Sequence, residues 1–202
     1  MEKKNNDDYR LAFWNERWQQ GQTGWDIGYP SPSICEYMQE KVSKDAAILI
    51  PGCGNAYEAE WLLQQGFKDI TLVDIAPKAV EILKEKFRGS ENINIICGNF
   101  FEMDGSFDVM VEQTFFCAID RNLRKAYVEK ATSLLKQNGK IIGLLFGIEF
   151  EKEGPPHGGS KEEYHRLFQE LFEIKNLDTC LNSIAPRAGN ELFIEFEKRN
   201  LR

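Results

Sequence analysis

The chain has 202 residues, 42% of them hydrophobic and 28% charged, which is enough for one sizeable core and predicts a single domain over residues 1–202. A net charge of −7 disfavours nucleic acids and anionic membranes as partners, and we expect a monomer whose ligand is a small neutral, anionic or thiol molecule. The five cysteines are widely spaced without a Cys-x-x-Cys pair, which predicts reduced thiols in a cytoplasmic protein and neither disulfides nor a metal site.

The N-terminal segment predicts a short tail followed by a covering helix. Residues 1–8 are polar and contain no apolar core, so we expect a flexible tail there and neither a signal peptide nor a membrane anchor. Leu11, Trp14 and Trp18 then share one helical face before Gly21 and Gly24 end the pattern. We expect this helix to cover the ligand crevice of the domain.

Apolar runs alternate with helix-period segments from residue 46 to about 172, which predicts a doubly wound α/β sheet. The predicted strands are mostly continuous apolar runs, as expected for strands covered on both faces: 46–50, 70–74, 93–96, 107–111 and 140–148. One helix is expected to follow Asn55, another to begin near Pro77, and a third to run from Leu123 to Leu135.

The last third of the chain predicts one more helix and one more strand. Ser160 and Glu163 form a capping box, and the apolar stripe after them predicts a helix that continues to Phe172. Apolar residues at every second position from Leu192 to Phe196 predict an antiparallel strand near the sheet edge.

A glycine turn and a distant carboxylate predict a cofactor that carries adenosine. Gly52 and Gly54 follow the first predicted strand, and Asp74 ends the second, about 20 residues after the first glycine, where an acidic side chain binds ribose hydroxyls. Such turns also join strands to helices without any ligand. Tyr57 occupies the position of the third glycine in the nicotinamide dinucleotide fingerprint, which disfavours that cofactor and leaves S-adenosylmethionine open.

Several motifs, taken in order, resemble the thiopurine S-methyltransferase family, most closely its branch of thiol and halide methyltransferases. They are Phe13–Trp18, Gly24–Asp26, Pro51–Gly54, Phe115–Ile119 and Gly154–Pro156, and the resemblance extends from Phe13 to Lys198. It implies a Rossmann-like class I methyltransferase fold, whose mostly parallel sheet has an antiparallel C-terminal strand and an N-terminal covering helix. It also implies that the chain uses S-adenosylmethionine and releases S-adenosylhomocysteine.

The resemblance further implies which residues contact the cofactor: Trp14, Trp18, Trp25, Gly52, Gly54, Asp74, Asn99, Phe100 and Gln113. Asn99 and Phe100 would meet the adenine, and the alternative interpretation is a plain turn with core aromatic residues. The chain departs from the family at two positions. Asn99 stands where an aspartate is expected, and His157 stands where the thiol and halide branch has tyrosine.

The chemistry implied is transfer of a methyl group to a small soft nucleophile, a thiol or thiopurine-type sulfur or a halide. A thiol is already partly ionised at neutral pH, so a general base is not required. His157 and Glu112 are the candidate residues of a substrate pocket, but an exposed loop histidine and a helix N-cap or loop role for Glu112 are open alternatives. Arg187 or Arg121, Arg124 and Lys125 are candidates for binding an anion, and solvated surface charge is the favoured alternative for each. The alternatives are an O- or N-methyltransferase, which needs a proton acceptor, or a non-catalytic module that binds S-adenosylmethionine.

Overall fold

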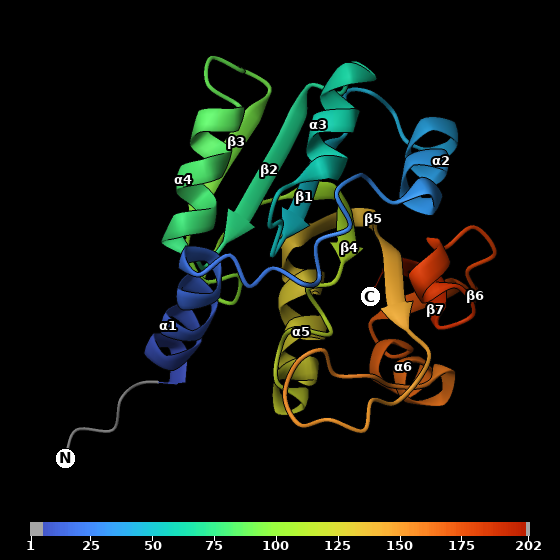
Figure 1. Ribbon diagram of the computed structural model, residues 1–202. Coiled ribbons are helices and arrows are strands. Elements are labelled where there is room, and N and C mark those ends of the chain that lie inside the picture. The colour runs from blue at the N-terminus through green and yellow to red at the C-terminus, as the bar shows by residue number, and fades with distance from the viewer. Residues whose placement is uncertain (1–5, 201–202) are drawn as a thin grey trace.

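The computed structural model describes residues 6–200, and within that range seven strands form one sheet in the order β3-β2-β1-β4-β5-β7-β6 (Figure 1). The strands are β1 Ala47–Pro51, β2 Asp69–Asp74, β3 Ile93–Cys97, β4 Phe107–Gln113, β5 Leu135–Phe146, β6 Phe172–Thr179 and β7 Glu191–Lys198. Neighbouring strands from β3 to β5 pair in parallel, whereas β7 is antiparallel to both β5 and β6.

Helices connect these strands and cover both faces of the sheet. They are α1 Asn6–Gln19, α2 Pro32–Lys41, α3 Tyr57–Gln64, α4 Pro77–Lys86, α5 Arg124–Leu134 and α6 Lys161–Phe168, with short 3-10 helices at η1 Arg121–Leu123 and η2 Ala185–Arg187. None of the described helices is both long enough and apolar enough to cross a membrane.

Strand β1 shows why the central strands are continuous apolar runs. Ile48 and Ile50 pack into one core with residues of α2, α3 and α4, while Ala47 and Leu49 pack into a second core with residues of α5 and α6. Successive side chains of a strand point to opposite faces, so every position must be apolar when both faces are covered. The predicted doubly wound sheet, with its antiparallel C-terminal strand, is therefore confirmed.

Several boundaries differ from those predicted. The strand predicted over 140–148 begins earlier, at Leu135, and ends at Phe146. The helix that opens at Ser160 ends at Phe168, because Phe172 already begins β6, a strand that was not predicted. Since β6 forms the sheet edge, β7 lies one strand inside it. At the other end of the chain, residues 1–5 of the predicted tail lie outside the described range, and α1 begins at Asn6, before the predicted end of the tail.

Helix α1 lies beyond the carboxyl end of β2 and against the first turn of α4 (Figure 1). The side-chain oxygen of Asn15 accepts a hydrogen bond of 2.8 Å from the backbone amide of Lys78. Trp18 is buried against Ala76 and Ala79 in a small cluster of its own. The predicted covering helix is thus docked at the edge of the sheet where ligands of open α/β proteins bind.

Candidate active site

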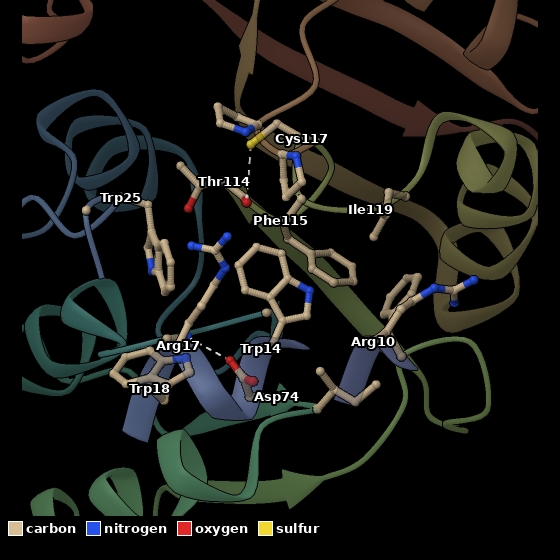
Figure 2. A pocket seen from close by; sticks show the side chains of 18 of the residues that line it. Arg10, Trp14, Arg17, Trp18, Trp25, Asp74, Thr114, Phe115, Cys117 and Ile119 are labelled. Carbon is tan, nitrogen blue, oxygen red and sulfur yellow. Dashed lines mark hydrogen bonds between the residues drawn. The ribbon is translucent and has the colours of Figure 1, made fainter. Parts of the chain in front are cut away.

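A cavity of about 450 Å³ lies where α1 meets the carboxyl ends of the parallel strands (Figure 2). Most of the residues predicted to hold the cofactor line it: Trp14, Trp18, Trp25, Gly52, Gly54, Asp74, Asn99 and Phe100. They come from segments that are far apart in the sequence, namely α1, the loop after it, and the turns that follow β1, β2 and β3. The fold therefore brings together in one cavity eight of the nine residues predicted from the sequence.

The turn after β1 is held in place by the carboxylate that ends β2. Asp74 accepts hydrogen bonds from the amide of Gly54 at 3.1 Å and from the amide of Ala76 at 2.9 Å. Burial raises the pKa of the Asp74 carboxyl, and these amide donors oppose the shift. Gly52 has φ of +56°, and a Cβ atom there would lie 2.3 Å from Phe115 Cδ2. The turn thus requires glycine at this position for both its backbone angle and its packing.

Three tryptophans form one wall of the cavity. The rings of Trp14 and Trp25 lie 5.4 Å apart and nearly perpendicular, and those of Trp18 and Trp25 lie 6.1 Å apart at 69°. Edge-to-face pairs of this kind add stability beyond the apolar area that they bury. The tryptophans therefore pack α1 onto the domain and also present aromatic surface to the cavity.

Asn99 and Phe100 likewise combine a structural role with a place in the cavity wall. The side-chain oxygen of Asn99 accepts a bond of 3.1 Å from the amide of Phe101, which closes the turn after β3. Phe100 is buried and stacks on Tyr127 with ring centroids 5.4 Å apart. Because the Asn99 oxygen is engaged within its own turn, the replacement of the expected aspartate leaves this local geometry intact.

Gln113 lies in an adjoining hollow of about 50 Å³, which shares Trp25, Gly52, Gly54 and Thr114 with the main cavity. Its side-chain oxygen Oε1 is buried and has no hydrogen-bond partner. A buried acceptor without a donor costs free energy, so this oxygen suits a ligand that brings an N–H group. The hollow therefore extends the site beyond the glycine turn.

The two candidate residues of the substrate pocket, Glu112 and His157, are not among the described residues that line the cavity. Glu112 is 1% exposed and lies beneath the cavity wall. The amide of His157 donates to the carbonyl of Cys117 at 2.7 Å, and the preceding prolines, Pro155 and Pro156, line the cavity in its place. Burial and the charge of Arg124 lower the pKa of the His157 imidazole.

Cationic side chains from three separate segments line the cavity, and sequence reasoning identified just one of them. Arg10 and Arg17 come from α1, Lys152 from the loop before the prolines, and Arg187 from η2. Figure 2 shows Arg17 reaching from the helix that carries Trp14 and Trp18 toward Thr114. Arg17 follows Trp14 by three residues, a spacing that places both on one face of a helix, and this was the signal available in the sequence.

Arg187 is fixed at the cavity wall by neighbours from two other segments. Its guanidinium donates to the carbonyl of Trp25 at 2.9 Å and to Glu191 Oε1 at 3.3 Å. By contrast, Arg124 is 2% exposed and donates to Glu163 and to the carbonyl of Gly158, so it fastens the loop after the prolines outside the cavity. Arg187 thus remains a candidate for anion binding, whereas Arg124 has a structural role.

The fold of the chain is similar to that of solved S-adenosylmethionine-dependent methyltransferases. The structure of magnesium protoporphyrin IX methyltransferase from Synechocystis PCC 6803 with bound S-adenosylmethionine has a TM-score of 0.76 against this chain. The match covers 98% of this chain and 100% of that one at 11% sequence identity, so it concerns the fold. The glycine turn and Asp74 lie where this fold binds its ligands.

The family is established by sequence. A family model for thiopurine S-methyltransferase matches residues 9–193, so the chain belongs to this family and is an S-adenosylmethionine-dependent methyltransferase. A probable thiol methyltransferase 2 from Arabidopsis thaliana is 29% identical over 191 residues, which cover 92% of this chain and 84% of that protein. A thiopurine S-methyltransferase from Acinetobacter baylyi is 27% identical over 203 residues, which cover 88% of this chain and 92% of that protein. The resemblance seen in the motifs is confirmed.

Because the imidazole of His157 is not part of the described cavity wall, His157→Phe is expected to change kcat/KM by the same factor for a thiol and for iodide. We expect that factor to be less than about threefold, since no proton transfer through this residue is lost. Steady-state kinetics with both acceptors measure it, and His165→Phe on the exposed side of α6 is the matched control. A fall in kcat/KM for the thiol without a fall for iodide would instead support His157 as a general base.

Proposed function

We propose that the chain transfers the methyl group of S-adenosylmethionine to a small soft nucleophile, a thiol or thiopurine-type sulfur or a halide. One observation supports this acceptor class most directly. The described residues that line the cavity include four cationic side chains, no histidine, and no carboxylate besides Asp74. Cations favour an acceptor that arrives as an anion, and such an acceptor has no proton to lose.

The proposal assigns the cofactor to the residues around the glycine turn. Asp74 would bind the ribose hydroxyls, and Asn99 with Phe100 would bind the adenine. The unpaired oxygen of Gln113 supports a place for the cofactor's ammonium group, because that group carries the N–H donors that the oxygen lacks. Gly52 and Gly54 would pass beneath the methionine portion.

When bound, S-adenosylmethionine supplies an activated methyl group on a sulfonium, so the protein needs mainly to align the reactants and exclude water. Trp14, Trp18 and Trp25 would close the cavity and present ring faces, which attract a cation by about 0.5–2 kcal/mol each. Arg17, Lys152 and Arg187 would stabilise the anionic form of the acceptor. The proposal describes a monomeric, cytoplasmic, single-domain enzyme, and the net charge of −7 supports the absence of nucleic acid or an anionic membrane among its partners.

The experiment that tests the proposal is a panel of acceptors assayed against pH. Calorimetry with S-adenosylmethionine and NADH first establishes which cofactor binds. A thiol, a thiopurine, thiocyanate, iodide and a phenol are then compared. Without a general base, kcat/KM for an aliphatic thiol should rise with pH until the free thiol ionises at about 8.5, whereas that for iodide should stay flat.

Two results would contradict this proposal. Methylation of the phenol in preference to every sulfur acceptor and halide would indicate an O-methyltransferase. Binding of S-adenosylmethionine without turnover of any acceptor would favour a non-catalytic binding module.

A further inference from the structure

Glu112 is a buried carboxylate with all of its hydrogen bonds directed into the protein. It is the next-to-last residue of β4, and it is 1% exposed. One carboxylate oxygen accepts from the amides of Phe115 at 2.9 Å and Phe116 at 2.7 Å, and the other accepts from the hydroxyl of Tyr127 at 2.6 Å. A buried carboxylate is costly unless it is fully hydrogen-bonded, so these donors account for its presence.

The two amides belong to the segment that forms one wall of the cavity. Residues 114–119 leave the end of β4 with Thr114 at φ of +59°, a left-handed angle that is uncommon for a residue other than glycine. Five of these six residues line the cavity: Thr114, Phe115, Cys117, Ala118 and Ile119. Figure 2 shows Cys117 at the end of the cavity opposite Asp74. Cys117 therefore lies on the side away from the proposed ribose site, whereas Phe115 packs beside Gly52 of the glycine turn.

The third hydrogen bond connects the same carboxylate to helix α5. Tyr127 is fully buried, stacks on Phe100, and meets Phe116 edge to face with ring centroids 4.9 Å apart. The chain has little freedom to shift around Glu112, because a Cβ atom at the neighbouring Gly143 would lie 1.9 Å from the Glu112 carbonyl oxygen. The backbone of Glu112 is thus held against β5 and its carboxylate is held by α5, and the same carboxylate accepts the two loop amides.

We propose that Glu112 is a positioning residue, whose carboxylate fixes residues 114–119 as the acceptor side of the cavity wall before any ligand binds. This inference rests on the proposed function, because that function is what makes this wall the acceptor side of the cavity. It goes beyond that function by giving Glu112 a role through the loop amides, in place of direct contact with the substrate.

Glu112→Leu is expected to raise the KM of the acceptor by about tenfold or more, because both loop amides lose their buried acceptor and the wall shifts. The Kd for S-adenosylhomocysteine should rise by a clearly smaller factor, since the hydrogen bonds that Asp74 accepts from Gly54 and Ala76 do not involve Glu112. Glu112→Gln is the conservative variant that keeps one oxygen for the two amides, and Tyr127→Phe removes just the bond to α5. Glu112→Gln is expected to keep the acceptor KM within about threefold of wild type, and Tyr127→Phe is expected to raise it less than Glu112→Leu does, because the bonds to both loop amides remain.

An unchanged acceptor KM in folded Glu112→Leu would overturn the proposal, as would equal losses of cofactor and acceptor binding. Hydrogen exchange on the unliganded wild-type protein tests it independently of any variant. The amides of Phe115 and Phe116 should be strongly protected, while amides beside the exposed Leu181 exchange rapidly. Rapid exchange at Phe115 and Phe116 would also overturn it. Failure of the wild-type protein to methylate any acceptor would instead contradict the proposed function, and the exchange result would still decide whether the loop is fixed.

Discussion

Replacing Asp74 by alanine is expected to weaken S-adenosylhomocysteine binding by about 5- to 150-fold, which corresponds to about 1–3 kcal/mol. The carboxylate lines the cavity and accepts the amides of Gly54 and Ala76. The variant would remove charged hydrogen bonds to the ribose and would also free the Gly54 amide of the glycine turn. Calorimetric titration of the folded variant measures the loss.

Two companion variants separate these contributions. Asp74→Asn keeps one oxygen in place with nearly the same shape, so it should weaken binding less than alanine does. Asp69→Ala removes an exposed carboxylate at the opposite end of the same strand and should leave the Kd unchanged. If Asp74→Ala bound S-adenosylhomocysteine as tightly as Asp69→Ala, the ribose assignment would be wrong.

Asp74 could be predicted from the sequence because its position depends on local rules. It ends an apolar strand, and the parallel pairing of β1 with β2 sets Pro51 opposite Val73, which brings the glycine turn beside the strand end. A parallel sheet covered on both faces follows from continuous apolar runs. The spacing between the first glycine and the acid is then sufficient to place both at one edge of the sheet.

The sequence left a pocket role and a loop role open for both Glu112 and His157, because the choice depends on contacts across the fold. His157 follows the Gly-Pro-Pro motif and was a candidate for the substrate pocket. Its backbone amide instead donates to the carbonyl of Cys117, which belongs to a different loop. Glu112 ends a strand at the correct edge of the sheet, but the donors around it come from the following loop and from α5. Sequence position indicates which end of the sheet a side chain occupies, and tertiary packing decides whether it reaches the cavity.

Strand β6 was missed for a different reason. It has a neighbour on one side, and its sequence places Glu173, Lys175 and Asp178 among a few apolar residues. Charged residues of this kind are typical of edge strands, where they discourage pairing with other chains. They also remove the apolar pattern by which the central strands were recognised.

Gly52→Ala is expected to lower the free energy of unfolding by about 2–5 kcal/mol, which combines the strain of a left-handed residue with overpacking of the core. The new Cβ atom would lie 2.3 Å from Phe115 Cδ2, so the ring or the turn must move. Since the same turn carries Gly54 and its bond to Asp74, binding of S-adenosylhomocysteine should fall by at least about tenfold. Denaturant unfolding and calorimetry measure the two effects.

The matched control is Gly89→Ala, because Gly89 also has a positive φ, +79°, but has no atom within 4 Å of the position that its Cβ would take. It should lose about 1–2 kcal/mol from backbone strain alone and keep the wild-type Kd. In the Phe115→Ala background, Gly52→Ala should lower the free energy of unfolding by less than it does in the wild-type protein, since the clashing ring is absent. Equal losses of stability at Gly52 and Gly89 would mean that the backbone angle alone requires glycine, and that Phe115 does not constrain the turn.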